Sequence, residues 1–480
     1  MSPHLTAPAP PPSGSGAVLV NDVHSQLNPT WVAEVVEATS VVRVQEIVRD
    51  AARTGRAVCI AGGRHAMGAQ QFADGATLID MRPLSRILAF DDGRGTVDVE
   101  AGIAWPELIE GLLGLQGDDE TSWGIAQKQT GADRLTIGGA IAANAHGRGL
   151  TMRPFVADVE AVTIIDHRGD LVRCSRAQHR ATFELVCGGY GLFGIVVSAS
   201  LRLVPRIKLR RVVEVLGIDA LMESFDDRIA RGFRYGDFQF AIDPRSRDFL
   251  RRGVFSTYEP VDPVTPIPDD QLVLSDAEWR EMLHLAHVDK SRAFELYAEH
   301  YLGTSGQIYW SDTHQLTTYI DDYHRELDVR HAAPVRATEM ISELYVPRAR
   351  LADFMTDAAA ALRHDGVNVI YGTVRLIERD DDSFLAWARE PWACVIFNLH
   401  TEHTPDGLAQ AAAAFRRLID LAAVRGGSYF LTYHRWATRE QVLACHPRMP
   451  EFLRRKREHD PDGRFQSDWY RHHVRLLGEG

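Results

Sequence analysis

Apolar positions recur with two different periods over the first 205 residues. A helical period begins after Ser40 and stops at Gly55, and its apolar positions are Val44, Ile47, Val48 and Ala51. A second amphipathic stretch, 105–113, predicts another helix. Short apolar runs predict strands at 57–60, 77–81, 96–100, 159–165, 171–174 and 197–204. Because strands and helices mix without a strict strand–helix–strand repeat, the pattern predicts an α+β fold.

The predicted elements become longer after residue 205. Longer helices and strands are predicted at 276–301, 340–346, 351–363, 393–399 and 408–425. A cluster of Pro and Asp at 259–270 predicts a surface loop, and 116–129 predicts a loop in the first part of the chain. Since 480 residues are too many for one compact core, we expect two lobes.

Composition limits the partners of the chain. Its formal net charge of −12 disfavours nucleic acid and anionic membranes as main partners. No stretch approaches the roughly 18 consecutive apolar residues that span a membrane. Residues 1–16 are rich in Pro, Ser and Ala and lack a secretory signal pattern, so we expect a disordered tail. The five cysteines are widely spaced and form no C-x-x-C pair, which indicates a reducing cytoplasm.

Three glycine-rich segments, 61–68, 136–149 and 188–196, adjoin predicted strands. Glycine lets a backbone approach a ligand closely, and successive loop N–H groups can cradle a pyrophosphate. The third segment contains G-x-G-x-x-G, but a dinucleotide-binding fingerprint follows a strand and opens a helix. Here a helical stretch precedes the glycines and a strand follows them, so we reject that interpretation. Together the three segments suit a long, flat ligand.

The order and spacing of these segments resemble the FAD-binding domain of the vanillyl-alcohol oxidase superfamily, which has the PCMH-type flavoprotein fold. The similarity covers roughly residues 28–206. Four motifs carry it: 58–65 with 77–81, the V-x-V-x-x-G strand at 97–102, the segment 138–141 with His146-Gly147, and the adenine-side segment 193–196. The resemblance implies a two-lobed α+β protein, with a PCMH-type FAD-binding lobe and an α+β substrate (cap) domain.

The cofactor implied by the resemblance is FAD. In the family, a histidine that matches His65 can bond covalently to the flavin, so the FAD is either attached covalently through His65 or bound non-covalently. A second link, through cysteine, is not expected, because 132–135 contains none. The predicted FAD-binding residues are Ala61, Gly62, Gly63, Arg64, His65, Ala66, Met67, Thr130, Gly131, Thr136, Gly138, Gly139, Ala142, Asn144, His146, Gly147, Gly194, Ile195, Val196 and Tyr433.

The rest of the chain resembles carbohydrate oxidoreductases of the same superfamily. Segments 426–430 and 460–468 are similar to decaprenylphosphoryl-ribose oxidase, and 374–376 with 380–382 is similar to sugar-lactone and alditol oxidases. The implied organisation is a tail at 1–16, an FAD-binding domain at 17–206 and a cap domain at 207–430. A C-terminal segment, 431–480, then returns to the FAD lobe.

Five residues are predicted to act in catalysis. His146 matches a histidine near flavin and substrate, or is structural. Arg375 matches a substrate-site arginine, or forms a cross-strand ion pair. Glu343 is predicted to bind hydroxyls or to act as a base, and Tyr433 or His434 serves as a base where a relative has lysine. His400 and His403 lie three residues apart without a third ligand, so we expect a polar loop and no metal site.

The resulting hypothesis is an FAD-dependent oxidoreductase that oxidises a CH–OH group of a sugar, polyol or related metabolite by hydride transfer to flavin N5. Its expected partners are a small-molecule substrate and an electron acceptor, either O2 or another acceptor, and it is a possible homo-oligomer. Two alternatives stay open. One is a flavin-dependent C=C reductase of the sterol Δ24-reductase type, and the other is a non-catalytic flavin-fold subunit.

Overall fold

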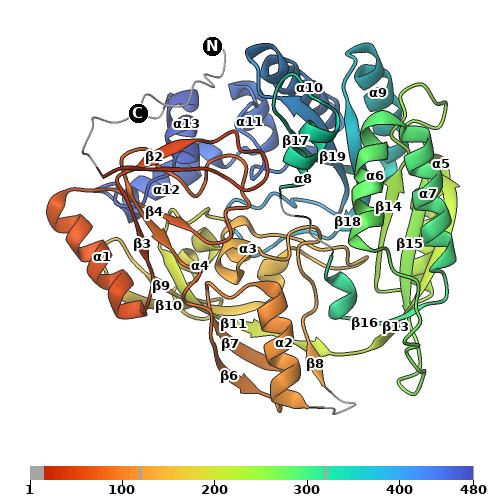
Figure 1. The fold of residues 1–480 in the computed structure, drawn as a ribbon. Coiled ribbons are helices and arrows are strands. Elements are labelled where there is room, and N and C mark those ends of the chain that lie inside the picture. Colours follow the sequence, from red (N-terminus) through yellow and green to blue (C-terminus); the bar gives the residue numbers. More distant parts are fainter. Residues whose placement is uncertain (1–15, 118–121, 318–319, 321, 479–480) are drawn as a thin grey trace.

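The computed structural model describes residues 16–117, 122–317, 320 and 322–478 (Figure 1). The tail predicted for 1–16 lies outside the described residues, apart from Gly16. Helices and strands both contribute widely, which confirms the α+β prediction. Within the described residues, no helix is both long enough and apolar enough to cross a membrane. All five cysteines are buried and free.

The strands of the first 205 residues form small sheets. A parallel sheet has the order β3-β5-β4, an antiparallel sheet has the order β10-β9-β11-β7-β6, and β1-β2 and β12-β8 are pairs. The strands are β1 (Val18–Val20), β2 (Thr30–Val32), β3 (Glu34–Glu37), β4 (Val58–Ala61), β5 (Thr77–Asp80), β6 (Ile87–Asp91), β7 (Thr96–Glu100), β8 (Trp123–Gly124), β9 (Val159–Ile165), β10 (Leu171–Ser175), β11 (Ile195–Arg202) and β12 (Val204–Pro205). The helices are α1 (Val41–Thr54), α2 (Trp105–Gln116), α3 (Ile137–Ala143) and α4 (Arg180–Val186).

Helix α1 forms where the sequence predicts it. The Ser40 side chain accepts a hydrogen bond from the Arg43 N–H at 3.1 Å, and Gly55 ends the helix with a φ of 69°. The buried face of α1 packs in the same apolar cluster as Phe465, from the C-terminal segment. The Val58 N–H donates to the Arg464 carbonyl at 2.7 Å, so the end of the chain lies against β4.

An antiparallel eight-stranded sheet follows, in the order β16-β13-β15-β14-β18-β19-β17-β20. Its strands are β13 (Lys208–Gly217), β14 (Tyr235–Phe240), β15 (Arg252–Pro260), β16 (Ile308–Trp310), β17 (Ala337–Pro347), β18 (Val369–Ile377), β19 (Trp392–Glu402) and β20 (Ser428–Tyr429). Since the strands change sheet between Pro205 and Lys208 and the large sheet ends at Tyr429, we propose domain boundaries at these two places.

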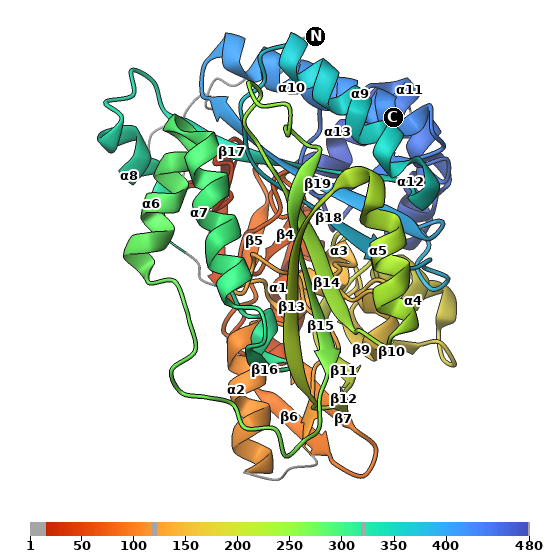
Figure 2. The same cartoon turned by 90° about the vertical axis from the view of Figure 1, so that its right-hand side faces the viewer.

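Helices cover both faces of this large sheet (Figure 2). One face carries α5 (Ile218–Ala230), α9 (Leu351–His364) and α10 (Pro405–Ala423). The other face carries α6 (Asp276–Val288), α7 (Lys290–Gly303) and α8 (Tyr323–Arg330). The C-terminal helices are α11 (Arg439–Cys445), α12 (Met449–His459) and α13 (Asp468–Leu477). One buried apolar cluster joins residues of both sheet regions, so the two parts share a core.

Three local predictions are wrong. The single helix predicted at 276–301 is two helices, because the Asp289 side chain accepts a hydrogen bond from the Arg292 N–H at 3.1 Å and starts α7 anew. The loop predicted at 116–129 contains β8 in its described part, because β12 pairs with it. The polar loop predicted around His400 is strand β19, paired with β17 along its whole length.

Candidate functional site

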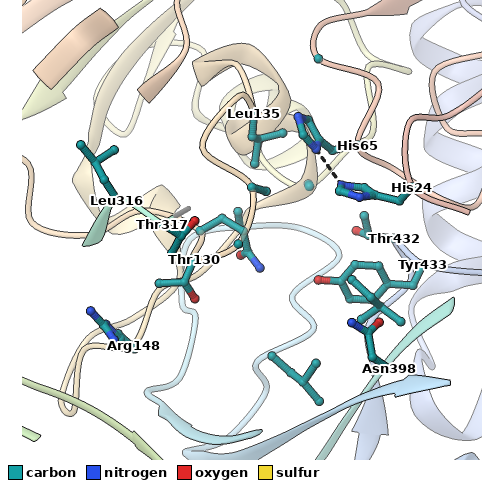
Figure 3. A pocket seen from close by; sticks show the side chains of 18 of the residues that line it. His24, His65, Thr130, Leu135, Arg148, Leu316, Thr317, Asn398, Thr432 and Tyr433 are labelled. Carbon is teal, nitrogen blue, oxygen red and sulfur yellow. Dashed lines mark hydrogen bonds between the residues drawn. The ribbon is translucent and has the colours of Figure 1, made fainter. Parts of the chain in front are cut away.

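A cavity of about 740 Å³ lies where the N-terminal loops and α3 meet the large sheet and the helices α6 and α7. This volume falls within the range of roughly 300–1,000 Å³ typical of small-molecule and cofactor sites. Figure 3 shows part of its wall: His24 and His65 lie on one side near Tyr433, and Thr130, Thr317 and Arg148 lie across the cavity from them.

The first glycine segment forms a wall of backbone. Strand β4 leads into Gly62 and Gly63, which pack directly on the neighbouring loop. A Cβ atom at Gly62 would lie 2.2 Å from Thr136 Oγ1, and one at Gly63 would lie 2.4 Å from the Arg134 carbonyl oxygen. Any side chain at either position would therefore force the two loops apart. Both glycines line the cavity, as do Arg64, His65 and Ala66.

The second and third segments add further small residues. Thr136 caps α3 by accepting a hydrogen bond from the Gly139 N–H at 3.2 Å, and a Cβ at Gly138 would lie 3.0 Å from the Ala101 carbonyl oxygen. The third segment follows α4 and precedes β11, which is the order that argues against a dinucleotide-binding fingerprint. The cavity residues from these segments include Thr136, Gly138, Gly139, Ala142, Gly191, Gly194 and Val196.

His65 is a half-buried polar side chain of this wall. Its Nδ1 lies 2.7 Å from Nε2 of His24, and the two rings are 4.9 Å apart. Burial and the neighbouring His24 lower the pKa of His65 to about 3. The imidazole is therefore neutral at physiological pH, which is the nucleophilic form of histidine.

The large sheet supplies another wall of the cavity. Three sheet residues line the cavity: Arg375 on β18, Asn398 on β19 and Ile341 on β17. Ile341 and Asn398 are direct partners across the two strands, so they share one face of the sheet. Tyr433, just after β20, reaches the same space. Arg375 is buried, and its Nε and Nη1 atoms make no hydrogen bond with the described residues.

A buried network backs this wall. His146 Nε2 lies 2.6 Å from Glu343 Oε1, and both side chains are fully buried. The Tyr345 hydroxyl donates to the same carboxylate oxygen. His146 Nδ1 lies 3.0 Å from the Gly147 carbonyl oxygen, to which it donates. Because Nδ1 carries one proton, the short contact from Nε2 to Glu343 needs a second proton between the two groups.

Electrostatics favour the ionised form of Glu343. Burial raises its pKa, but His146, Tyr345 and Arg375 outweigh burial and hold the pKa below its ordinary value. Burial and the charge of Glu343 raise the pKa of Tyr433 well above its ordinary value. Tyr433 is therefore a neutral phenol between the cavity and an ionised carboxylate.

Comparison with known proteins decides the cofactor. A family model described as an FAD binding domain matches residues 32–175. Residues 32–175 of this chain are an FAD-binding domain. The matched range contains the first two glycine segments and His65, and the cofactor of such a domain is FAD.

Three relatives show how far the similarity extends. The chain is 25% identical over 202 residues to L-gulonolactone oxidase of Bos taurus, and 27% identical over 248 residues to cytokinin dehydrogenase 6 of Oryza sativa subsp. japonica. These matches cover 42% and 45% of this chain and 44% of each relative, less than half of their length. The chain is also 22% identical over 456 residues to L-gulono-1,4-lactone dehydrogenase of Mycobacterium tuberculosis, covering 92% of this chain and 96% of that relative.

The cavity fits FAD, because buried polar atoms point into it without partners among the described residues. These atoms are Arg64 Nε and Thr130 Oγ1, both from segments predicted to bind FAD. Each unpaired buried polar group costs about 1–3 kcal/mol. A ligand with polar groups along its length offsets that cost, and the glycine walls leave room for it.

The structure brings only part of the predicted site to the cavity surface. The predicted residues that line it are Gly62, Gly63, Arg64, His65, Ala66, Thr130, Gly131, Thr136, Gly138, Gly139, Ala142, Gly194, Val196, Arg375 and Tyr433. The predicted residues outside the lining are Ala61, Met67, Asn144, His146, Gly147, Ile195, Glu343 and His434. His146 and Glu343 lie one layer behind the surface, through their contact with each other and with Tyr433.

Two predicted site residues have structural surroundings instead. The Asn144 side chain donates to Asp380 at 2.9 Å and accepts from the Val156 N–H at 2.9 Å, which ties α3 to the following turn. The His434 ring stacks on Phe415 with 4.5 Å between ring centres. Burial and nearby Arg416 lower the pKa of His434 to about 3. His434 is therefore a packed, neutral ring and does not face the cavity.

Sequence reasoning missed many of the cavity residues, and three polar ones show why. His24 contacts His65 from a segment that carries no motif. Arg148 follows the predicted His146-Gly147 pair and was a detectable extension of that segment. Asn398 lies on the predicted strand at 393–399, but only the register of β19 shows which of its residues face the cavity.

Proposed function

We propose that this chain is an FAD-dependent oxidoreductase that oxidises a CH–OH group of a sugar, an aldonolactone or a polyol. The observation that carries the proposal is the group of Arg375, Tyr433 and Asn398 at the sheet wall of the FAD cavity, backed by ionised Glu343. Similarity to L-gulonolactone oxidase and L-gulono-1,4-lactone dehydrogenase supports this substrate class.

When bound, FAD supplies an acceptor for the hydride of the substrate carbon. The residues of the chain then bind the substrate oxygens and take the hydroxyl proton. The unpaired Nε and Nη1 atoms of Arg375 donate to these oxygens and fix their orientation.

A proton leaves the substrate hydroxyl through Tyr433. The phenol oxygen accepts that proton in the same step in which its own proton moves to Glu343, so no phenolate forms; the lowered pKa of Glu343 keeps the carboxylate ionised before the transfer. His146, 2.6 Å behind Glu343, shares the charge and holds the carboxylate in place. Burial excludes water from this route, since both His146 and Glu343 are fully buried.

We also propose that His65 bonds covalently to FAD. A low pKa keeps the imidazole neutral, the His24 contact holds Nδ1 at 2.7 Å, and Nε2 makes no hydrogen bond of good geometry with the described residues. The bond adds stability to cofactor binding and places the flavin near the first glycine segment. Five free, buried cysteines fit a reducing compartment such as the cytoplasm.

The test is anaerobic reduction of the purified, flavin-loaded protein by a panel of small molecules. The panel contains aldonolactones, aldoses, polyols, isopentenyl-type N-alkyl adenines, and NADPH with an enone. We expect at least one lactone, sugar or polyol to bleach the visible flavin absorption.

Bleaching by the N-alkyl adenines alone, or by NADPH alone, assigns the cavity to amine oxidation or C=C reduction and overturns the proposal. A flavin that none of them bleaches supports a non-catalytic subunit. Reoxidation by O2 or by an artificial quinone then identifies the acceptor.

A further inference from the structure

A second cluster of polar side chains lies on the same sheet face, beyond the FAD cavity. Strands β17 and β19 supply Glu339 and His400, α6 supplies His287, and α8 supplies His324. These four side chains surround a separate cavity of about 340 Å³. Asp328 and Glu402 also line this cavity, so its walls carry negative charge.

Three side chains of this cluster, His287, Glu339 and His400, are spaced like the ligands of one metal ion, and His324 lies against the other side of the carboxylate. Glu339 Oε1 lies 3.1 Å from His287 Nε2 and 3.5 Å from His400 Nδ1. His324 Nδ1 pairs with the other oxygen, Oε2. The ligand atoms of His287, Glu339 and His400 all lie within 4.8 Å of one another. Zinc bonds of about 2.0–2.1 Å in a tetrahedral site place ligand atoms about 3.3–3.5 Å apart.

The protonation of His287 shows that something positive belongs between these groups. Its Nδ1 lies 2.8 Å from the Leu283 carbonyl oxygen and donates to it, so in the neutral ring the lone pair is on Nε2. That lone pair faces the Glu339 carboxylate at 3.1 Å. Two acceptors at this distance repel each other unless a proton or a metal ion lies between them. A donor bond from the far nitrogen to a backbone carbonyl is also how metal-bound histidines are oriented.

The His324 ring, which lies against the other oxygen of the Glu339 carboxylate, points to the same conclusion. His324 Nδ1 is buried and makes no hydrogen bond of good geometry with the described residues, although it lies beside Glu339. Three imidazoles and one carboxylate are ligands that Zn²⁺ and neighbouring transition metals prefer over Ca²⁺ or Mg²⁺. The His400 side chain is 26% exposed, which provides an entry path for the ion.

We propose that His287, His324, Glu339 and His400 bind one Zn²⁺ ion, away from the FAD. The ion joins two helices to two strands of the large sheet. Helix α6 carries Met282, Leu283 and Ala286 in the wall of the FAD cavity, so the ion fixes a wall of the substrate-side cavity. Its role is to hold the cap helices in place, and it takes no part in the oxidation.

The experiment measures zinc in the flavin-loaded protein after removal of any affinity tag. The protein is dialysed against a chelator, then against ZnCl2, then against metal-free buffer, and zinc and flavin are quantified in the same sample. We expect about one zinc per chain. Glu339→Gln and His287→Gln should each retain less than a tenth of the wild-type zinc, while His364→Asn, at an exposed position, should retain all of it.

A second readout covers variants that fold poorly. Wild-type protein loaded with Co²⁺ should show the ligand-field absorption of a four-coordinate site, at wavelengths longer than those of the flavin bands. Its thermal midpoint should rise by a few degrees with Zn²⁺, as expected for a ligand that binds only the folded state. Wild-type protein with no zinc and no cobalt bands, or with zinc that Glu339→Gln retains in full, overturns the proposal, because a shared proton then accounts for the cluster. Either result leaves the FAD assignment untouched.

Discussion

Two buried carboxylates on strand β17 are proposed to have different roles. Glu339 and Glu343 lie four residues apart on β17, on the same face, and about 13 Å apart along the strand. Each is buried, each contacts a histidine whose other nitrogen donates to a backbone carbonyl, and the pKa of each lies below its ordinary value. What differs is the rest of the surroundings.

Glu343 has a fixed cation beside it, and Glu339 does not. Arg375 and the phenols of Tyr345 and Tyr433 surround Glu343, so its charge is balanced and its protons can move. Glu339 is contacted by the imidazoles of His287, His324 and His400 and accepts a hydrogen bond from the Tyr323 hydroxyl at 2.7 Å. No arginine or lysine side chain of the described residues forms an ion pair with it. On the two proposals made above, the same His–Glu pair acts as a proton acceptor beside arginine and as a cation ligand beside further imidazoles.

Removal of the arginine should have the largest effect. Arg375→Ala is expected to lower kcat/KM by about 10²–10³-fold, because it removes charge-assisted hydrogen bonds to the substrate. Flavin content and zinc content should stay at wild-type values. Steady-state kinetics with the best substrate of the panel, with flavin quantified in the same preparation, makes the measurement. Equal loss of flavin and turnover would make Arg375 a structural residue.

Removal of the Tyr433 hydroxyl tests the proton route alone. Tyr433→Phe should lower kcat by about 10- to 100-fold with little change in KM, since the ring still packs and only the proton transfer is lost. The matched control is Tyr345→Phe, whose hydroxyl also donates to Glu343 but whose ring does not line the cavity. If both variants slow the reaction equally, the hydroxyl of Tyr433 has no special place in the route.

His65 contacts the side chain of His24, and no contact among the described residues joins His65 to Glu339 or Glu343, so its loss should leave both carboxylate sites unchanged. After acid precipitation, wild-type protein should give a yellow pellet and His65→Ala a white pellet with yellow supernatant. A yellow pellet from His65→Ala would place the covalent bond elsewhere.

The same residue predicts a pH effect. The folded-state pKa of His65, about 3, lies below the ordinary value of 6.5. The unfolded chain therefore binds a proton more readily between these values, and stability falls as pH drops through this window. In flavin-free protein, His65→Gln should lose about 1–3 kcal/mol less than wild type between pH 6.5 and pH 4 by denaturant unfolding. Parallel pH curves would contradict this.

The smallest effect concerns a histidine that only borders the second cluster. His331 Nε2 lies 2.7 Å from His284 Nδ1, and the two rings pair with each other. His331→Asn should cost about 0.5–1 kcal/mol of stability. Zinc stoichiometry should stay the same, measured as for Glu339→Gln. Loss of zinc from this variant would move the ligand set toward the His284–His331 pair.

Local signals explain the parts of the fold that the sequence predicted. The cap at Ser40 and the stop at Gly55 are encoded within a few residues. The glycine segments are visible in the sequence by residue type alone. The contacts that require Gly62, Gly63 and Gly138 are long-range, because they involve Thr136, Arg134 and Ala101.

Long-range packing explains the rest. The His24–His65 contact joins two segments with no shared motif, and Asp289 divides a helical pattern by a single capping bond. His400 was interpreted as part of a polar loop because its partners come from α6, α8 and β17, which no local pattern brings together. His434 seemed as good a base as Tyr433 until packing placed it against Phe415.

The most direct test compares anaerobic flavin reduction in wild type, Glu343→Gln and Glu339→Gln, each fully loaded with flavin, by rapid mixing with one substrate. The account predicts that Glu339→Gln reduces its flavin at the wild-type rate, and that Glu343→Gln does so at least about 100-fold more slowly, because the proton acceptor is gone. Equal rates for Glu343→Gln and wild type, or equal slowing of both variants, would contradict the proposal that Glu343 accepts the proton and that Glu339 takes no part in the reaction.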